Sequence, residues 1–99
     1  MRVRWTTPAR LQLRAHARYI ALNNPAAARR VTQRVRSAVS GLATHPLKGR
    51  PGRVLDTREL VVAHTSLIVA YRVTDKVAEV IAVIHGAQEW PESFDDPES

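Results

Sequence analysis

Three side chains at or near the ends of predicted strands are of types that could act on a phosphate ester. Arg58 and Arg72 carry guanidinium forks suited to clamping phosphate oxygens, and His85 can give or take a proton near neutral pH. Each of these residues could instead have a structural role. The arginines could form surface salt bridges with Glu59, Glu79 or a partner's carboxylate, and His85 could be a strand-end histidine hydrogen-bonded to backbone.

The strands that position these residues are predicted at about 58–63, 67–73 and 77–85, where the β-branched residues Val and Ile are frequent. Polar turns at residues 64–66 and 74–76 separate them. Connections this short join neighbouring antiparallel strands, so the C-terminal half is predicted to form an antiparallel sheet.

Two helices are predicted before these strands, after a short N-terminal strand in which Val3 and Trp5 alternate with arginines. Their predicted caps and first-turn prolines are Thr6 or Thr7 with Pro8, and Asn24 with Pro25. Apolar residues at spacings of three and four form one face of each helix: Ala9, Leu13, His16 and Ile20 in the first, and Ala28, Val31, Val35, Ala38 and Leu42 in the second. The pair reads as an antiparallel hairpin, with Trp5, Tyr19 and His16 packed in the core.

The order strand, helix, helix, strand, strand, strand predicts an α+β fold with the hairpin on one face of a small antiparallel sheet. Residues 1–90 are expected to form a single domain. Residues 46–57 are rich in Pro, Gly and Arg and are predicted to be a flexible basic loop. Residues 91–99 are acidic and without periodicity, which predicts a flexible C-terminal tail.

The outer face of the sheet is predicted to be apolar and exposed. Arg72 and Glu79 carry charges that are costly to bury beneath the helical hairpin. The strand faces that carry them should therefore point outward. These faces also carry the apolar residues Ile68, Ala70, Ile81 and Val83. A contiguous apolar patch of this kind marks a binding surface. Dimerisation, or cover by the C-terminal tail, would account for it equally.

Charge and composition narrow the classes of protein. The net charge is +6, and residues 1–88 hold all fifteen basic side chains, thirteen of them Arg, but only four of the nine acids. Such a body attracts nucleic acid or an acidic protein segment, unless it is simply a solvated basic shell. The absence of cysteine excludes disulfides and thiolate metal sites, and four histidines on separate elements favour no metal site. No signal peptide or membrane-spanning stretch is recognised, so a cytoplasmic location is expected.

Several short motifs recur in an order and spacing similar to one known family. They are Trp5-Thr6, Ala9, Leu13, Tyr19-Ile20, Asn24-Pro25-Ala26-Ala27-Ala28, His45-Pro46, Gly49-Arg50-Pro51-Gly52, Arg58-Glu59-Leu60, Tyr71-Arg72-Val73, Ile84-His85-Gly86-Ala87 and Trp90-Pro91. Over roughly residues 3–91, this set resembles the ParE-type toxins of the RelE/ParE superfamily.

The resemblance implies the toxin of a bacterial type II toxin–antitoxin module, which needs no cofactor. Its cognate antitoxin would have a DNA-binding N-terminal half and an acidic amphipathic C-terminal segment that wraps the toxin. That segment would dock by apolar anchors and strand addition on a surface made of Ile68, Ala70, Arg72, Ile81 and Val83. ParE-like members are described as inhibitors of DNA gyrase, and RelE-like members as ribosome-dependent mRNA interferases.

The C-terminal motif favours the ParE-like activity. His85 matches a histidine that some RelE-like nucleases use, but Gly86 stands where those enzymes typically have tyrosine, and Leu67 where an arginine is expected. We therefore expect binding to gyrase rather than catalysis, with target contacts from Arg50, Arg53, His85 and Trp90. The alternative is an endoribonuclease that uses Arg58, Arg72 and His85. A toxin relic or a plain RNA- or DNA-binding module is a third possibility.

Overall fold

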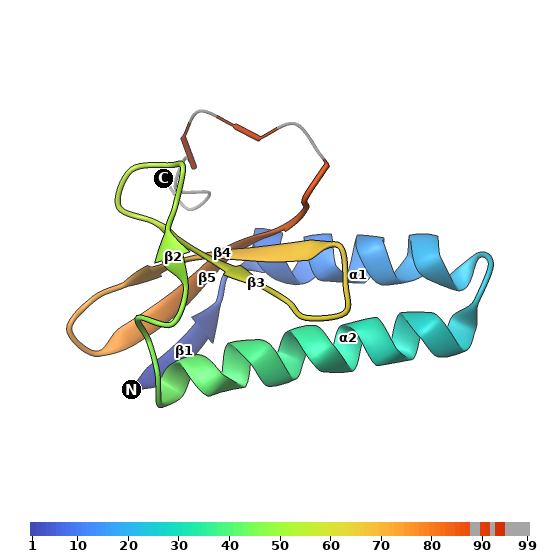
Figure 1. The fold of residues 1–99 in the computed structure, drawn as a ribbon, viewed down its shortest axis with the longest axis horizontal. Coiled ribbons are helices and arrows are strands. Elements are labelled where there is room, and N and C mark those ends of the chain that lie inside the picture. Colours follow the sequence, from blue (N-terminus) through green and yellow to red (C-terminus); the bar gives the residue numbers. More distant parts are fainter. Residues whose placement is uncertain (88–89, 92, 95–99) are drawn as a thin grey trace.

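The computed structural model describes residues 1–87, 90–91 and 93–94 of the 99-residue chain. Its elements follow in the order β1 (Arg2–Trp5), α1 (Thr7–Ala21), α2 (Pro25–Ser40), the 3-10 turn η1 (Gly41–Ala43), β2 (Arg50–Pro51), β3 (Arg58–Val61), β4 (Leu67–Val73) and β5 (Val77–His85). The two helices run antiparallel along the long axis of the molecule and extend past the end of β4 (Figure 1). The α+β class and the order of the predicted elements are confirmed.

Both helices begin where the sequence predicts. The Thr6 side chain accepts a hydrogen bond from the Ala9 backbone N–H at 3.3 Å, and Asn24 accepts one from Ala27 at 3.0 Å. Each helix has its proline in the first turn, where the missing N–H costs no hydrogen bond. Tyr19 was expected in the core, but its side chain is 68% exposed, because the buried face of α1 is formed by Ala9 and Leu13.

The sheet is mixed rather than purely antiparallel, with strand order β1-β5-β4-β3-β2. β3, β4 and β5 form the predicted antiparallel meander, but β1 pairs with β5 in parallel, from Arg2 opposite Val77 to Trp5 opposite Val80. The Thr6 N–H continues this ladder by donating to the Val80 carbonyl at 3.0 Å. Since α1 begins at Thr7 and packs along β5, the strand before it has to run in the same direction as β5.

Beyond the end of β1, the side chains of Thr6 and of α1 residues contact the backbone groups at the edge of β5. The Thr6 hydroxyl donates to the Ile81 carbonyl at 3.3 Å, and the Val83 N–H donates to Gln12 Oε1 at 2.8 Å. The His16 ring lies with Nε2 3.0 Å from the Val83 carbonyl. His16 is thus half-buried on the inward face of α1, as predicted, and this edge of the sheet is closed.

A β-bulge changes which residues of β5 face outward. Ala70 lies opposite Ala82, but Tyr71 lies opposite Val80, so Ile81 is an extra residue. The alternation of β5 therefore reverses at this point, and Val83 packs with Val80 in the core beneath the helices. The prediction that Val83 lies on the outer face is wrong, because strict alternation was extended through a position where the strand bulges.

Two apolar clusters lie on opposite faces of the sheet. The larger packs the helices onto β3, β4 and β5, and the smaller contains Ala70, Ala82 and Ile84, with Trp90 and Phe94 packed against it. The described residues of the segment after β5 lie on the side of the sheet away from α2 (Figure 1). The predicted exposed patch is therefore absent, since Ile68, Ala70, Ile81 and Val83 are each at most 8% exposed. For Ala70, cover by the C-terminal segment, an alternative considered from sequence, is what the described residues show, whereas Val83 is buried in the core beneath the helices.

Residues 46–57 contain structure that the sequence does not reveal. Arg50 and Pro51 form β2, which pairs with Glu59 and Arg58 of β3. The Gly52 N–H donates to the Thr57 carbonyl at 2.7 Å, and a side chain on Gly52 would collide with Thr57. The segment predicted as a flexible loop is thus a fifth, short strand with a closed turn after it.

Within the described part of the chain, no helix is both long and apolar enough to cross a membrane. Of the predicted acidic tail, Pro91, Ser93 and Phe94 are described, and Phe94 packs on the sheet. Residues 92 and 95–99, on which the rest of that prediction depends, lie outside the described residues.

Candidate functional site

A buried carboxylate organises the outer face of the sheet next to the C-terminal segment. Glu59 lies on β3 opposite Ala70, so its side chain points to the face that Trp90 covers. Only 3% of Glu59 is exposed. A buried charge is costly unless it is paired and hydrogen-bonded, so its surroundings decide whether it is tolerated.

β2 and the loop after it supply the partners of Glu59. Arg50 donates from Nη2 to Oε1 at 3.0 Å and from Nε at 3.4 Å. Arg53 donates to Oε2 twice, from its backbone N–H at 2.7 Å and from Nε at 3.2 Å. Both carboxylate oxygens are therefore satisfied, and the loop is fastened to the sheet at this point.

These contacts set the protonation of the carboxyl group. Burial acts to raise the pKa of Glu59, but the hydrogen bonds from Arg53 and Arg50 and the positive charge of Arg53 outweigh it. The net result is a pKa below the ordinary value of a glutamate. Glu59 is thus ionised at neutral pH and holds two arginine side chains, which remain about half-exposed, in fixed positions.

Arg53 also connects the loop to the C-terminal segment. Its guanidinium carbon lies 3.7 Å from the centre of the Trp90 ring, a cation–π geometry. Trp90 in turn packs against Ala70, Ala82 and Ile84, and its indole Nε1 is buried with no hydrogen-bond partner among the described residues. Three of the four residues predicted to contact a target, Arg50, Arg53 and Trp90, therefore form one cluster around Glu59. We call this the Glu59 cluster.

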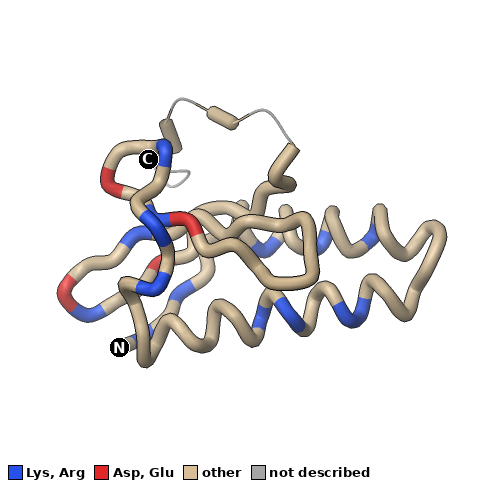
Figure 2. The backbone as a smooth tube through the Cα atoms, in the orientation of Figure 1, with Lys and Arg blue, Asp and Glu red and all other residues tan. Residues whose placement is uncertain are grey.

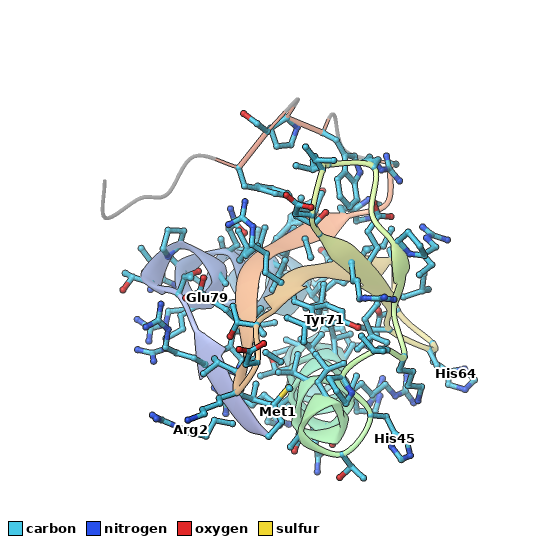
Figure 3. The ribbon with its side chains drawn as sticks, turned by 90° about the vertical axis from the view of Figure 1, so that its left-hand side faces the viewer. Met1, Arg2, His45, His64, Tyr71 and Glu79 are labelled. Atoms are coloured by element: carbon cyan, nitrogen blue, oxygen red, sulfur yellow. The ribbon has the colours of Figure 1, made fainter. Side chains whose placement is uncertain are left out.

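Tyr71 supports the loop from the core side of the sheet. Its ring is fully buried, and its hydroxyl donates to the Pro46 carbonyl and accepts from the Gly49 N–H, both at 2.8 Å. Figure 3 shows Tyr71 in the interior, whereas His45 and His64 point outward at the periphery. A Cβ on Gly49 would lie 2.6 Å from the Tyr71 hydroxyl oxygen and 2.9 Å from the Glu59 carbonyl, so only glycine fits there.

The predicted phosphate clamps lie on opposite faces of the sheet. Arg58 is opposite Tyr71 on the core-side face, where its Nη1 donates to the Gly49 carbonyl at 2.8 Å. Arg72 follows Tyr71 on β4 and so points to the other face. Neither arginine forms the salt bridge considered with Glu59 or Glu79, because Glu59 pairs with Arg50 and Arg53, and Glu79 pairs with Arg4.

His85 lies at the other end of the sheet from Arg72. It is exposed at the end of β5, opposite Leu67, and its Nδ1 accepts a hydrogen bond from the Ala87 N–H at 3.1 Å. Arg72 lies five positions after Leu67 on β4, which corresponds to about 17 Å of strand. The three residues predicted for a ribonuclease are therefore not gathered around one point.

The sequence does not identify Glu59 and Tyr71 as organisers of the site. Both occur in the motifs quoted above, Glu59 after Arg58 and Tyr71 before Arg72, but a motif does not say what its side chains contact. One signal was present: Glu59 is one of only four acids before residue 89, and the apolar run Leu60-Val61-Val62 follows it directly. An acid in such a place among so many arginines is a candidate for a buried ion-pair centre.

Comparison with known proteins gives one matching family and several relatives. The model of the family described as the ParE toxin of the type II toxin–antitoxin system parDE matches residues 3–90. Y4kP, a protein of Sinorhizobium fredii named as a toxin, is 44% identical over 91 residues, which cover 92% of this chain and 94% of that protein. Toxin RelE2 of Caulobacter vibrioides is 33% identical over 84 residues, covering 85% and 93%.

Solved structures agree with this assignment. A chain of the chromosomal ParDE system from P. aeruginosa superposes with a TM-score of 0.75 at 25% identity, covering 86% of this chain and 95% of that one. A chain of the RelBE2 toxin–antitoxin complex from Mycobacterium tuberculosis gives a TM-score of 0.61 at 26% identity, covering 85% and 95%. The fold is thus shared by ParE-like and RelE-like proteins, and the likeness alone does not separate their activities.

Proposed function

Since the chain belongs to the ParE toxin family of type II toxin–antitoxin systems, we propose that it arrests growth by binding and inhibiting DNA gyrase. It acts in this proposal as a protein inhibitor, with no chemistry of its own. The Glu59 cluster is the contact surface, and His85 contributes from the end of β5. Family membership is the premise, and the choice of target rests on the arrangement of side chains.

The observation that carries the proposal is the arrangement of two residue sets. Arg50, Arg53 and Trp90 are joined around Glu59, so two guanidinium groups and an aromatic ring from β2, the loop after it and the segment after β5 lie together. Arginine and tryptophan are the residue types that most often dominate protein interfaces. In contrast, Arg58 and Arg72 point to opposite faces and His85 lies at the far end of β4. The first set is thus prearranged in the way that a contact surface requires, whereas the ribonuclease set is dispersed.

A cognate antitoxin is the second partner in this proposal. The related solved structures come from a ParDE system and a RelBE2 toxin–antitoxin complex, and a basic body suits an acidic antitoxin segment. The surface first predicted for it, at Ile68, Ala70, Arg72, Ile81 and Val83, is largely buried. An antitoxin would reach Ala70 only after Trp90 and Phe94 had left the sheet.

The proposal is tested by a supercoiling assay with purified chain and purified gyrase. We expect supercoiling to be lost when the chain is present in stoichiometric excess. Unchanged supercoiling under these conditions counts against gyrase as the target. A parallel assay on mRNA with ribosomes covers the second candidate.

That second candidate is a ribosome-dependent mRNA interferase that uses Arg58, Arg72 and His85. It is favoured by the 33% identity to a protein named toxin RelE2 and by the structural likeness to a RelBE2 complex. If toxicity and mRNA cleavage both disappear in His85→Ala while the variant stays folded, the interferase replaces the gyrase inhibitor.

A further inference from the structure

The outward face of α1 is unusually apolar for a helix surface. Leu11, Tyr19 and Leu22 are 55%, 68% and 81% exposed, and Ala15 between them is exposed as well. Their spacings of four, four and three place them on a single face of the helix, since Leu22 continues its geometry. We call these four residues the α1 stripe. A row of exposed apolar side chains on one face marks an interaction surface more often than scattered ones do.

A row of arginines lies beside the α1 stripe. Arg10, Arg14 and Arg18 follow one another at intervals of four residues on α1. Arg10 and Arg14, with Arg36 of α2, border a groove of about 270 Å³ between the helices, and Trp5, Leu13 and Ala17 give it apolar walls. None of these arginines forms an ion pair with a carboxylate of the described residues.

The helical hairpin has no acidic residue to balance this charge. The first acid of the chain is Asp56, so residues 1–55 contain twelve basic side chains and no carboxylate. Figure 2 shows basic residues along both helices, while the acidic residues among the described ones lie around the sheet and its loops. The arginines that do find carboxylates, Arg4, Arg50 and Arg53, are on the sheet or in the loop after β2. Among the described residues, the arginines of the hairpin therefore have no carboxylate partner, and their charge suits an acidic partner.

We infer that the α1 stripe and its arginine row bind an acidic amphipathic helix of the antitoxin, and this inference rests on the antitoxin partner proposed above. The partner helix lies along α1, with apolar side chains on Leu11, Tyr19 and Leu22 and carboxylates on Arg10 and Arg14. An amphipathic helix recognised in this way uses apolar anchors at spacings of three and four residues. Complementary charge speeds association and fixes orientation, and the apolar stripe excludes water from the contact.

Other positions for this partner fit less well. The outer face of the sheet is covered by Trp90 and Phe94. The edge of β5 beyond β1 is closed by side chains of α1, because Gln12 and His16 occupy the backbone groups of Val83. The same helix thus closes the strand edge with its inward face and offers the apolar stripe on its outward face.

Other occupants of the α1 stripe fit less well too. A second copy of this chain would bring two arginine rows together with no carboxylate between them, which is unfavourable. Nucleic acid would engage the arginines, but phosphates make no use of exposed Leu11, Tyr19 and Leu22. An acidic amphipathic protein helix satisfies both parts of the surface.

The experiment compares antitoxin affinities of exposed-residue variants. The probe is the antitoxin encoded next to this chain, and calorimetry measures its binding to purified chain. The double variant Tyr19→Ser/Leu22→Ser should bind about 100-fold more weakly, because two anchors are truncated. Arg14→Glu should associate about tenfold more slowly at low salt, with a difference that shrinks as salt is raised. The matched controls Leu47→Ser and Arg2→Glu, also exposed, should bind like wild type.

Each alternative outcome overturns the inference in a distinguishable way. Wild-type affinity in all variants overturns the α1 surface alone. No binding by the wild-type chain overturns this surface together with the antitoxin partner. Loss of self-association, or of binding to a short DNA duplex, with antitoxin affinity unchanged, assigns the stripe to a second copy or to nucleic acid instead. The gyrase assay is separate, so a chain that binds antitoxin but leaves gyrase active contradicts only the proposed target.

Discussion

Arg53 joins two parts of the chain that are far apart in sequence, with its guanidinium carbon 3.7 Å from the centre of the Trp90 ring. The same side chain donates to the buried carboxylate of Glu59. Arg53 therefore fastens the loop after β2 to β3, and the same side chain contacts the segment after β5. A target protein would meet both parts as a single surface.

Replacement of Glu59 by glutamine should loosen this surface. Glu59→Gln removes the charge that both arginines share, so we expect unfolding to become easier by about 1–3 kcal/mol, towards the lower value because the arginines are half-exposed. Glu79→Gln is the matched control, since Glu79 pairs with an arginine that is mostly solvent-exposed. Glu79→Gln should lower the free energy of unfolding by less than about 1 kcal/mol. Urea unfolding of both variants measures these losses of unfolding free energy. Equal losses in the two variants would contradict a special role for Glu59.

Acid should remove the contribution that the ionised Glu59 carboxylate makes to stability. The pKa of Glu59 is lower in the folded than in the unfolded chain, so its stabilising effect is complete above the ordinary glutamate pKa of about 4.3 and is lost as the pH falls through the lowered value. The measurement is the difference in unfolding free energy between wild type and Glu59→Gln across this range. It should be constant near neutrality and shrink on acidification. A difference that grows in acid would show that the pKa is raised instead.

Two glycines offer a matched pair for the packing under the loop. In Gly49→Ala, the new methyl group would lie 2.6 Å from the Tyr71 hydroxyl and 2.9 Å from a backbone carbonyl, so we expect a loss of about 1–3 kcal/mol. Gly41→Ala meets nothing within 4 Å and has helical geometry, so it should be neutral or stabilise by up to about 1 kcal/mol. Thermal unfolding of both variants checks this, and a stable Gly49→Ala protein would disprove the close packing against Tyr71.

Trp90 should matter for its ring and not for its indole N–H. The Nε1 group is buried without a partner in the described part of the chain, so Trp90→Phe removes no hydrogen bond and leaves an aromatic face for Arg53. We expect it to cost less than about 1.5 kcal/mol. Trp90→Ala uncovers Ala70, Ala82 and Ile84 and should cost about 1–3 kcal/mol more. Binding of a hydrophobic dye would report the uncovered sheet, and no difference between the two variants would contradict the packing of Trp90.

The fold could be predicted from the sequence because its signals are local. Thr6 and Asn24 cap the helices, prolines follow them, and β-branched runs mark β4 and β5. What failed depends on tertiary context. β1 has the same pattern whether it pairs in parallel or antiparallel, and two residues such as Arg50 and Pro51 are too few to show a strand of their own.

The sequence predicted the candidate site only in part, again because the arrangement of its residues depends on tertiary contacts. Arg50, Arg53 and Trp90 stand out as exposed types in a basic loop and after the last strand, but their convergence on Glu59 requires the sheet. The predicted outer face failed at Ile81, where one extra residue reverses the alternation and turns Val83 inward. A bulge leaves no mark in a run of apolar residues, so alternation alone could not place it.

Gyrase supercoiling measured with increasing amounts of purified chain tests the central claim most directly, with Arg53→Ala and the exposed control Arg2→Ala alongside. We expect wild type and Arg2→Ala to abolish supercoiling near stoichiometric amounts. Arg53→Ala, shown to be folded by circular dichroism, should need at least about tenfold more. Full supercoiling in the presence of excess wild-type chain, or equal inhibition by Arg53→Ala, would contradict the account.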